Sequence, residues 1–288
     1  EALSIDNLQV YPDITRKQIR IQGKVFNAGE RIEGMLSAKV ENSTSRLQIA
    51  SFEQQMDFQP GENLVNITCP MGDSIEVWSE FIPTLYTMDL KVEAGSQKAK
   101  GSVRFGMREF SRNQSDLLLN GKKVFLRGTL ECCIFPLTGR PPMDPEGWKK
   151  VFLTAREWGL NHLRFHSWCP PKAAFQVADS LGFYLQVELP LWSLKVGEEA
   201  RTNKFLYAEA DRILSEYGNH PSFCFFSLGN ELQPDFDFLT GLLKHVKSQD
   251  PRHLYTTTSF TFEGGHGDWP EPDDDFFITQ WTKKGWVR

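Results

Sequence analysis

Several features are scarce in this sequence, and each scarcity argues against a class of protein. No apolar run approaches the roughly 20 residues that a membrane-spanning helix needs. Lys and Arg number 32 against 37 Asp and Glu, and this net charge of -5 argues against a nucleic-acid-binding surface. No glycine-rich phosphate-binding turn follows any predicted strand, which weakens a nucleotide-binding interpretation. We therefore expect neither a membrane nor a nucleic acid as a partner.

Cysteine is also scarce, and its number argues against a disulfide-stabilised domain. The sequence has five cysteines, an odd number, and only Cys132 and Cys133 are adjacent. Together with His166 and Cys169 they match no standard zinc spacing. We therefore expect buried free thiols, no bound metal and no cofactor. The acidic stretch 268–276 lacks the spacing of a calcium loop, and we expect it to be solvated.

The first part of the chain, residues 1–108, alternates apolar and polar side chains with a period of two. In QIRIQGKVF (18–26), every second residue from Ile19 to Val25 is apolar or glycine. Residues 86–92 alternate in the same way. Short alternating strands separated by turns predict an immunoglobulin-like β-sandwich. This part shows no cluster of catalytic residue types, so we expect it to be structural or to take part in recognition.

The second part, residues 109–288, alternates apolar runs with amphipathic stretches. Between the first two runs, Asp144 and Pro145 fit the start of a helix and Gly159 fits its end. Repeated β-α units with nearly continuous apolar strands predict a parallel sheet. The predicted strands are 124–130, 162–167, 183–189, 222–228, 254–259 and 276–281. The predicted helical stretches are 144–160, 171–181, 203–217 and 236–249.

Polar and aromatic side chains gather where these predicted strands end. They are Glu131, Arg164, His166, Trp168, Glu188, Asn230, Glu231, Gln280 and Trp281. Enzymes with a (β/α)8 barrel build their sites at this end of the strands, so we favour a barrel over an open doubly wound sheet. Glu231, directly after a buried strand, is then placed to act as a general acid. The alternatives are a solvated glutamate or one paired with Arg164.

Four stretches that follow one another along the chain carry a family resemblance. They are 77–92 (VWSEFIPTLYTMDLKV), 104–130, 155–190 and 217–232 (YGNHPSFCFFSLGNEL). The last is the most specific, because His-Pro-Ser, an apolar strand and Gly-Asn-Glu follow one another in it. In this order the stretches resemble glycoside hydrolase family 2, which includes β-galactosidases, β-glucuronidases and β-mannosidases. The resemblance covers nearly the whole chain.

The resemblance implies a retaining β-glycosidase, in which two carboxyl groups carry out a double displacement. By position, Glu231 would be the acid/base and Asn230 would bind the 2-hydroxyl of the sugar. Arg164 would orient the nucleophilic carboxylate. His166 and Trp168 would line the sugar subsite.

Other positions depart from the family or fall outside the chain. Glu188 matches a family position at the third strand end, and Trp281 stands where the family often has a tyrosine; we expect both near the substrate. The nucleophile of the family, a glutamate at the end of the seventh strand, would follow Arg288. A complete barrel takes about 250 residues. We therefore expect 109–288 to be the first part of a barrel truncated after about six strands.

The same comparison with the family's usual layout implies that neighbouring parts of the polypeptide are missing. The family's first β-domain and the end of its barrel have no counterpart here, so we expect an internal piece that is inactive alone. Some β-galactosidases of the family bind Mg²⁺ through Glu and His just after the third strand. Trp192 and Leu194 occupy this stretch, so we expect no magnesium site of that kind.

The function implied by the resemblance is hydrolysis of terminal β-linked sugars in oligosaccharides or polysaccharides. A β-galactoside is the first expectation and a β-glucuronide the second, with a periplasmic or secreted location. The alternative is a non-catalytic carbohydrate-binding or scaffold protein on a degenerate barrel. The retained Gly229-Asn230-Glu231 argues against this alternative.

Overall fold

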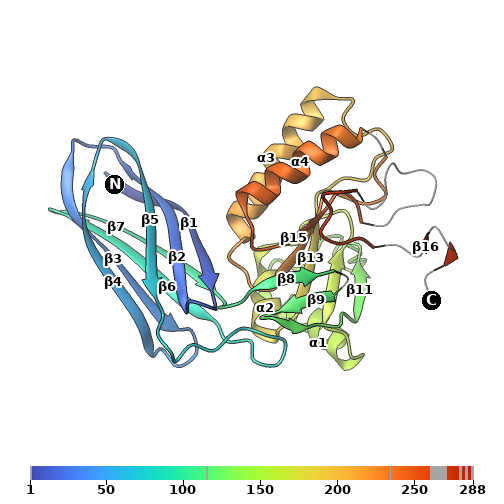
Figure 1. The fold of residues 1–288 in the computed structure, drawn as a ribbon, viewed down its shortest axis with the longest axis horizontal. Helices are drawn as coiled ribbons and strands as arrows, with labels where there is room; N and C mark the ends of the chain where they lie inside the picture. Colours follow the sequence, from blue (N-terminus) through green and yellow to red (C-terminus); the bar gives the residue numbers. More distant parts are fainter. Residues whose placement is uncertain are drawn as a thin grey trace. The chain divides into compact units, whose positions relative to one another are not determined.

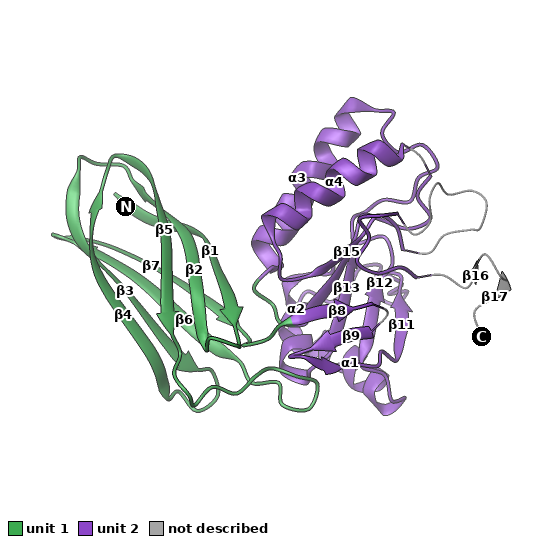
Figure 2. Ribbon diagram, in the orientation of Figure 1, with its two compact units in different colours: residues 1–109, 219–221 green, residues 110–218, 222–288 purple. Residues whose placement is uncertain are grey.

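The chain forms two compact units, which Figure 2 colours separately. Unit 1 comprises residues 1–109 and 219–221, and unit 2 comprises residues 110–218 and 222–288. The computed structural model describes residues 2–114, 116–233, 235–259 and 271–278, and the backbone of two short strands at 281–282 and 285–286. None of the helices described there is long and apolar enough to cross a bilayer.

Unit 1 is a β-sandwich, as the period of two predicts. One sheet has the strand order β1-β2-β5 and the other β4-β3-β6-β7, and all pairs are antiparallel (Figure 1). The inward-facing residues of the two sheets form one apolar core. The strands are β1 (Leu3–Asp13), β2 (Gln18–Asn27), β3 (Ile32–Asn42), β4 (Gln48–Phe58), β5 (Gly61–Pro70), β6 (Tyr86–Ala94) and β7 (Gln97–Phe105).

One glycine permits the pairing of β3 with β6 in this sandwich. A Cβ atom at Gly34 would lie 2.7 Å from the Cβ of Ala94 and 2.8 Å from the carbonyl oxygen of Glu93. A larger residue would therefore force the two strands apart.

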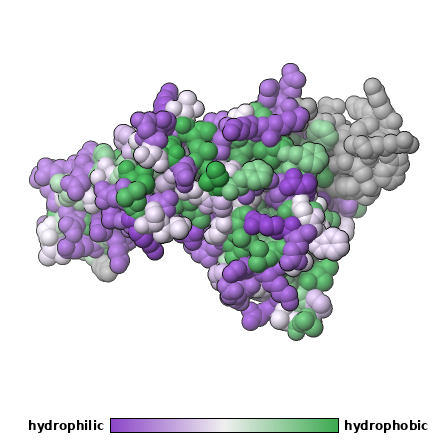
Figure 3. All heavy atoms as spheres, turned by 90° about the horizontal axis from the view of Figure 1, so that it is seen from below, coloured by the Kyte–Doolittle hydropathy of each residue, from purple (hydrophilic) through white to green (hydrophobic). Residues whose placement is uncertain are grey.

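Outside the core, hydrophobic residues are interspersed with hydrophilic ones on the face drawn in Figure 3, which is normal for a protein surface.

Unit 2 begins with a small antiparallel sheet and continues into a five-stranded parallel sheet. The antiparallel strands are β8 (Phe110–Asn113), β9 (Asp116–Leu119) and β10 (Lys122–Lys123). The parallel strands are β11 (Gly128–Glu131), β12 (His162–Phe165), β13 (Tyr184–Glu188), β14 (Phe223–Ser227) and β15 (Leu254–Thr256). The helices are α1 (Pro145–Glu157), α2 (Lys172–Leu181), α3 (Ala200–Tyr217) and α4 (Phe236–Gln249). The short strands β16 (Trp281–Thr282) and β17 (Gly285–Trp286) pair with each other.

The order of the parallel strands is that of a barrel. It runs β11-β12-β13-β14-β15, so each strand pairs with the next strand along the chain. In a doubly wound sheet the spatial order of the strands reverses at a switch point, whereas the order of these five strands does not reverse. The prediction of a (β/α)8-type sheet is confirmed over these five strands. Helices α3 and α4 lie side by side in Figure 1.

The helix boundaries follow the local sequence signals. The Asp144 carboxylate accepts a hydrogen bond from the backbone N–H of Gly147 at 2.9 Å, and Pro145 occupies the first position of α1. Gly159, at a positive φ of 75°, follows the helix. The parallel strands are shorter than predicted. For example, β11 starts at Gly128 instead of residue 124, and β15 ends at Thr256 instead of residue 259.

The sequence prediction was wrong for two features next to β15. The described residues 276–278 of the predicted sixth strand form no strand, and two carboxylates of the acidic stretch are not solvated. Asp275 accepts the N–H of Tyr255 at 3.0 Å, and Asp274 accepts the N–H of Thr257 at 2.7 Å. These are backbone donors along β15 that a sixth strand would be expected to use. Aspartate side chains therefore cap this part of β15.

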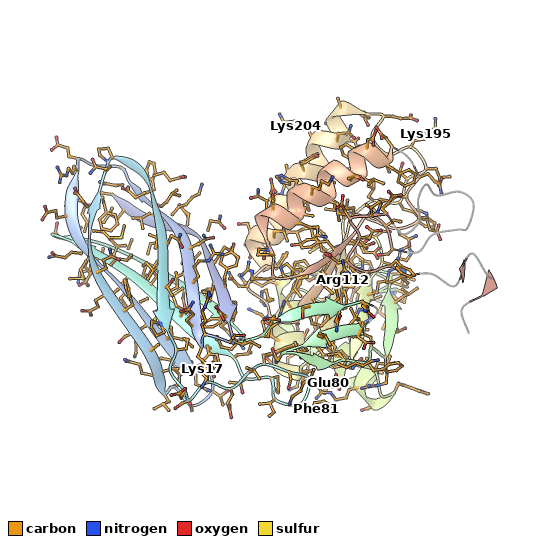
Figure 4. The ribbon with its side chains drawn as sticks, in the orientation of Figure 1. Lys17, Glu80, Phe81, Arg112, Lys195 and Lys204 are labelled. Carbon is orange, nitrogen blue, oxygen red and sulfur yellow. The ribbon has the colours of Figure 1, made fainter. Side chains whose placement is uncertain are left out.

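The two capping carboxylates differ in their electrostatic surroundings. Asp275 is paired with Lys247 at 2.8 Å and lies 3.6 Å from Arg112 of β8, which Figure 4 labels. Within the described residues, Asp274 instead bonds to neutral donors, among them the Thr257 hydroxyl and the N–H of Glu271. Burial therefore raises the pKa of Asp274 to about 6, and these hydrogen bonds offset only part of the rise.

The raised pKa of Asp274 predicts how stability depends on pH. A free aspartate has a pKa of about 3.9, so the folded chain holds a proton on Asp274 that the unfolded chain has released between about pH 4 and 6. Folding is favoured by that proton, and this contribution is lost as the pH rises through about 6. We expect Asp274→Asn to lose this part of the pH dependence. Urea unfolding at pH 4.5, 5.5 and 7 gives the free energy of unfolding of the variant and of the wild type. If the difference between these two free energies is the same at all three pH values, the raised pKa of Asp274 is contradicted.

Candidate active site

Toward their carboxyl ends, the parallel strands of unit 2 carry apolar side chains on one face of the sheet and polar side chains on the other. Leu163 and Phe165 of β12, and Leu185 of β13, belong to the apolar cluster that includes residues of α1 to α4. The alternate residues therefore face the other side of the sheet, which is the barrel interior. Arg164 is the register partner of Gln186. The period of two thus places polar side chains of neighbouring strands together.

A buried ion pair lies at the centre of this polar face. The Nε of Arg164 donates to Oε1 of Glu188 at 2.6 Å, and its Nη2 donates to Oδ1 of Asn230. The Glu188 side chain is fully buried and that of Arg164 is 8% exposed. The backbone N–H of Ser167 donates to Oε2 of Glu188 at 2.7 Å. Both carboxylate oxygens of Glu188 are therefore occupied by donors of the protein.

Gln186 and Ser259 extend the network, and the sequence analysis missed both. The side-chain amide of Gln186 donates to Oε1 of Glu188 at 3.0 Å and to the hydroxyl of Ser259 at 2.6 Å. Gln186 is buried between the apolar residues Leu185 and Val187. A signal was present, because a glutamine inside an apolar strand two residues before Glu188 must share its face. Ser259 had no comparable signal, since it follows the end of β15.

The segment after β14 is held by backbone hydrogen bonds on both sides. The N–H of Asn230 donates to the carbonyl of Leu191 at 3.0 Å, and the N–H of Ser259 donates to the carbonyl of Gly229 at 2.8 Å. A Cβ atom at Gly229 would lie 2.4 Å from the Leu191 carbonyl oxygen, so this close approach needs glycine. Glu231 has a positive φ of 51°, which is uncommon for a non-glycine residue. Such strain persists only where the surrounding structure imposes it.

Two polar groups of this segment have no partner among the residues that the structure describes. The Nδ2 of Asn230 is buried and donates to none of them, while its Oδ1 accepts from Arg164. The side chain of the half-buried Glu231 has neither a hydrogen bond nor an ion pair within the described chain. The alternative of a Glu231–Arg164 pair is therefore not observed, because Arg164 pairs with Glu188. A buried amide donor and an available carboxyl group lie on adjacent residues.

The other predicted site residues occupy different surroundings. His166 is half-buried, and its ring centroid lies 5.7 Å from that of Trp192. Trp168 packs against Phe165 with ring centroids 5.4 Å apart, and its indole N–H donates to the carbonyl of Glu131 at 3.0 Å. The structure thus shows Trp168 partly buried against the apolar cluster of unit 2. Trp281 lies in β16, and its side chain is outside the described residues.

The cysteine prediction holds only in part. Cys69 and Cys224 are buried, and burial raises the pKa of the half-buried Cys169 thiol. Cys132 and Cys133, however, are exposed in the loop after β11, because this loop extends beyond the strand ends. No group of three or more potential metal ligands gathers in the described part of the chain. At the end of β11, burial raises the pKa of the Glu131 carboxyl, and a hydrogen bond from the N–H of Cys133 offsets part of the rise.

The arrangement can bind a hydroxylated ligand and transfer a proton to it. Asn230 offers a donor in a buried position, and Arg164 fixes that amide in one orientation by occupying its oxygen. Glu231 offers a carboxyl group beside it. All of these groups follow the carboxyl ends of parallel strands, where barrel enzymes carry their active sites.

Comparisons with known proteins assign both parts of the chain to one family. The model of "Glycosyl hydrolases family 2" matches residues 3–108, and that of "Glycosyl hydrolases family 2, TIM barrel domain" matches residues 111–266. The chain is 27% identical over 207 residues to the β-galactosidase large subunit of Latilactobacillus sakei, covering 66% of this chain and 33% of that protein. It is 30% identical over 169 residues to a β-galactosidase of Priestia megaterium, covering 54% of this chain and 16% of that protein.

Solved structures show the same fold. A glycosyl hydrolase family 2 member from Bacteroides cellulosilyticus superposes with a TM-score of 0.84 at 17% identity, over 98% of this chain and 38% of that chain. The β-glucuronidase of Bacteroides uniformis superposes with a TM-score of 0.75 at 18% identity, over 90% of this chain and 33% of that chain. The chain spans about a third of the length of the first of the curated relatives. Over the length that it covers, the chain belongs to glycosyl hydrolase family 2.

Proposed function

We propose that the polypeptide containing this chain is a retaining β-glycosidase that releases terminal β-linked sugars from oligosaccharides or polysaccharides. The observation that carries the proposal is the pair of groups after β14 that have no partner in the described part of the chain, the Asn230 Nδ2 and the Glu231 carboxyl. Relatives named β-galactosidase and a structure named β-glucuronidase support the substrate class. We propose a β-galactoside first and a β-glucuronide second.

Glu231 acts in both halves of the reaction. In the first, a second carboxylate attacks the anomeric carbon, the bond to the leaving oxygen breaks, and that oxygen takes its electron pair and the proton of Glu231. In the second, the Glu231 carboxylate takes a proton from water, and the water oxygen displaces the enzyme carboxylate from the sugar. The carboxyl group must therefore be free of competing ion pairs, as Glu231 is within the described chain.

Asn230 and Arg164 prepare the sugar site rather than transfer protons. The Asn230 amide donates its free N–H to the sugar 2-hydroxyl, a contact that strengthens as positive charge develops at the anomeric carbon. Arg164 holds that amide by occupying its oxygen. A donor fixed before the substrate arrives needs no reorganisation during the reaction.

Glu188 is unsuited to the role of nucleophile. Its two oxygens accept hydrogen bonds from Arg164, Gln186 and Ser167, and its side chain is fully buried. An attacking carboxylate needs an oxygen that can approach the sugar. We propose that the nucleophile is supplied by the polypeptide following Arg288, and that Glu188 serves to anchor Arg164.

Removing the acid group tests the proposal directly. On the whole polypeptide we expect Glu231→Gln to lower kcat/KM about 10²- to 10⁴-fold on natural glycosides, because the leaving oxygen loses its proton donor. The loss is smaller on nitrophenyl glycosides, whose leaving group needs little protonation. Glu198→Gln, the same change at an exposed position, is the matched control and retains activity. Hydrolysis rates on a panel of nitrophenyl β-glycosides and matching disaccharides give the comparison.

Two results would overturn parts of the proposal. If the wild-type polypeptide binds sugars but hydrolyses none of the panel, the protein is a carbohydrate-binding or scaffold protein. If Glu231→Gln retains full activity on disaccharides, another residue supplies the proton.

Sodium azide, which attacks the glycosyl-enzyme without base assistance, should restore turnover of Glu231→Ala with an activated leaving group and yield a glycosyl azide.

The Gln186 network predicts a second effect on activity. Gln186→Leu removes the donor shared by Glu188 and Ser259, and hydrogen bonds to charged groups contribute about 1.5–3 kcal/mol. We expect kcat/KM to fall about tenfold or more, with a smaller loss for Ser259→Ala, which leaves the bond to Glu188 in place. A thermal unfolding curve for each variant separates this effect from a loss of folded protein. Full activity in folded Gln186→Leu would contradict a positioning role.

A further inference from the structure

Trp192 is a large aromatic side chain that no part of the proposed mechanism uses. It lies in the segment after β13, which also carries Lys195, labelled in Figure 4, and its side chain is 64% exposed. Exposure by itself does not mark a binding surface, because single exposed hydrophobic side chains are normal. The position of Trp192 relative to Glu231 determines what it could bind.

Backbone hydrogen bonds tie the residues on both sides of Trp192 to the segment of Glu231. The carbonyl of Leu191 accepts from the N–H of Asn230 at 3.0 Å. The carbonyl of Ser193 accepts from the N–H of Gln233 at 3.1 Å. The segments that carry Trp192 and Glu231 thus lie side by side, and backbone hydrogen bonds join them on both sides of these two residues. The backbone at Trp192 is therefore held next to the backbone of Glu231 before any substrate binds.

The ring of Trp192 is turned toward the end of β12. Its centroid lies 5.7 Å from that of His166, and the two rings meet edge to face at 78°. The N–H of Ser167, the next residue, donates to Glu188. The indole is thus exposed next to the end of β12, whereas the Asn230 amide and the ion pair are buried.

The buried Asn230 amide and the exposed Trp192 suit two different parts of a glycoside substrate. The sugar that undergoes reaction must reach the buried Asn230 amide. The part of the substrate beyond the scissile bond must extend toward solvent, and the exposed Trp192 lies on the segment that adjoins Glu231. The apolar C–H face of a pyranose ring stacks on a flat indole, whereas its hydroxyl edge remains free to bond with water.

From this placement we propose that Trp192, supported by His166, forms the binding platform for the leaving-group sugar of the substrate. The inference rests on the proposed glycosidase function and adds a residue that favours substrates in which a second pyranose follows the scissile bond. In retaining catalysis, kcat/KM includes the step in which the leaving group departs, whereas hydrolysis of the glycosyl-enzyme is common to all leaving groups.

Three substrates with the same reacting sugar test this platform in the whole polypeptide. They are a β-linked disaccharide, the nitrophenyl β-glycoside and the methyl β-glycoside, whose leaving group has no ring. We expect Trp192→Ala to lower kcat/KM on the disaccharide about tenfold and on the methyl glycoside less than about twofold. Trp192→Phe should recover part of the loss, because a smaller flat ring remains. Trp158→Ala, at an 81% exposed position at the end of α1, is the matched control.

Each other outcome overturns the inference in a recognisable way. Equal losses on all three substrates, with a lower unfolding temperature, would make Trp192 a structural residue. A loss on the nitrophenyl glycoside alone would assign the platform to an aromatic leaving group instead of a sugar. Full activity on the disaccharide would remove the platform altogether. Absence of hydrolysis by the wild type would instead refute the glycosidase function and is thus distinguishable.

A second measurement uses the reverse direction of the same contact. When an added sugar competes with water for the glycosyl-enzyme, it must occupy the leaving-group position. We expect Trp192→Ala to reduce the ratio of transfer to hydrolysis about tenfold with a sugar acceptor and to leave the ratio unchanged with methanol. An unchanged ratio with both acceptors would contradict the platform, even if the substrate series agreed with it.

Discussion

The buried ion pair between Arg164 and Glu188 is the interaction on which the candidate site depends. Two charges removed from water are costly unless hydrogen bonds occupy the remaining positions. Here the donors come from Arg164, Gln186 and Ser167, so both oxygens of the carboxylate are satisfied. The arginine in turn holds the Asn230 oxygen, and the amide N–H has no acceptor among the residues that the structure describes. One pairing therefore fixes groups from three successive strand ends.

The sequence predicts the scaffold well because the scaffold depends on periodic local signals. The alternation around Ile19 to Val25 specifies a sandwich strand, and Asp144 with Pro145 specifies the start of α1. The order of strands and helices in unit 2 follows from repeated β-α units, and the comparisons confirm the barrel family. The family resemblance also identified Arg164, Glu188, Asn230 and Glu231 as candidates, and the structure brings these residues to neighbouring strand ends.

Features that depend on distant partners could not be predicted in this way. Ser259 accepts from Gln186, 73 positions earlier in the chain, and nothing near Ser259 indicates that partner. The aspartates at 274 and 275 look solvated in the sequence, because acidic runs usually are. Their bonding to β15 depends on backbone groups some 17 to 20 positions away. The sequence also does not distinguish Trp168, which is partly buried against the apolar cluster, from Trp192, which is exposed.

The aspartate side chains next to β15 also have a consequence for the edge of the sheet. A sheet edge with unsatisfied N–H groups can template pairing with another molecule. Asp275 and Asp274 accept hydrogen bonds from two edge N–H groups, those of Tyr255 and Thr257, and Asp275 is also paired with Lys247. These two N–H groups are therefore not available to a strand of another molecule, and acidic side chains protect this part of the edge against aggregation.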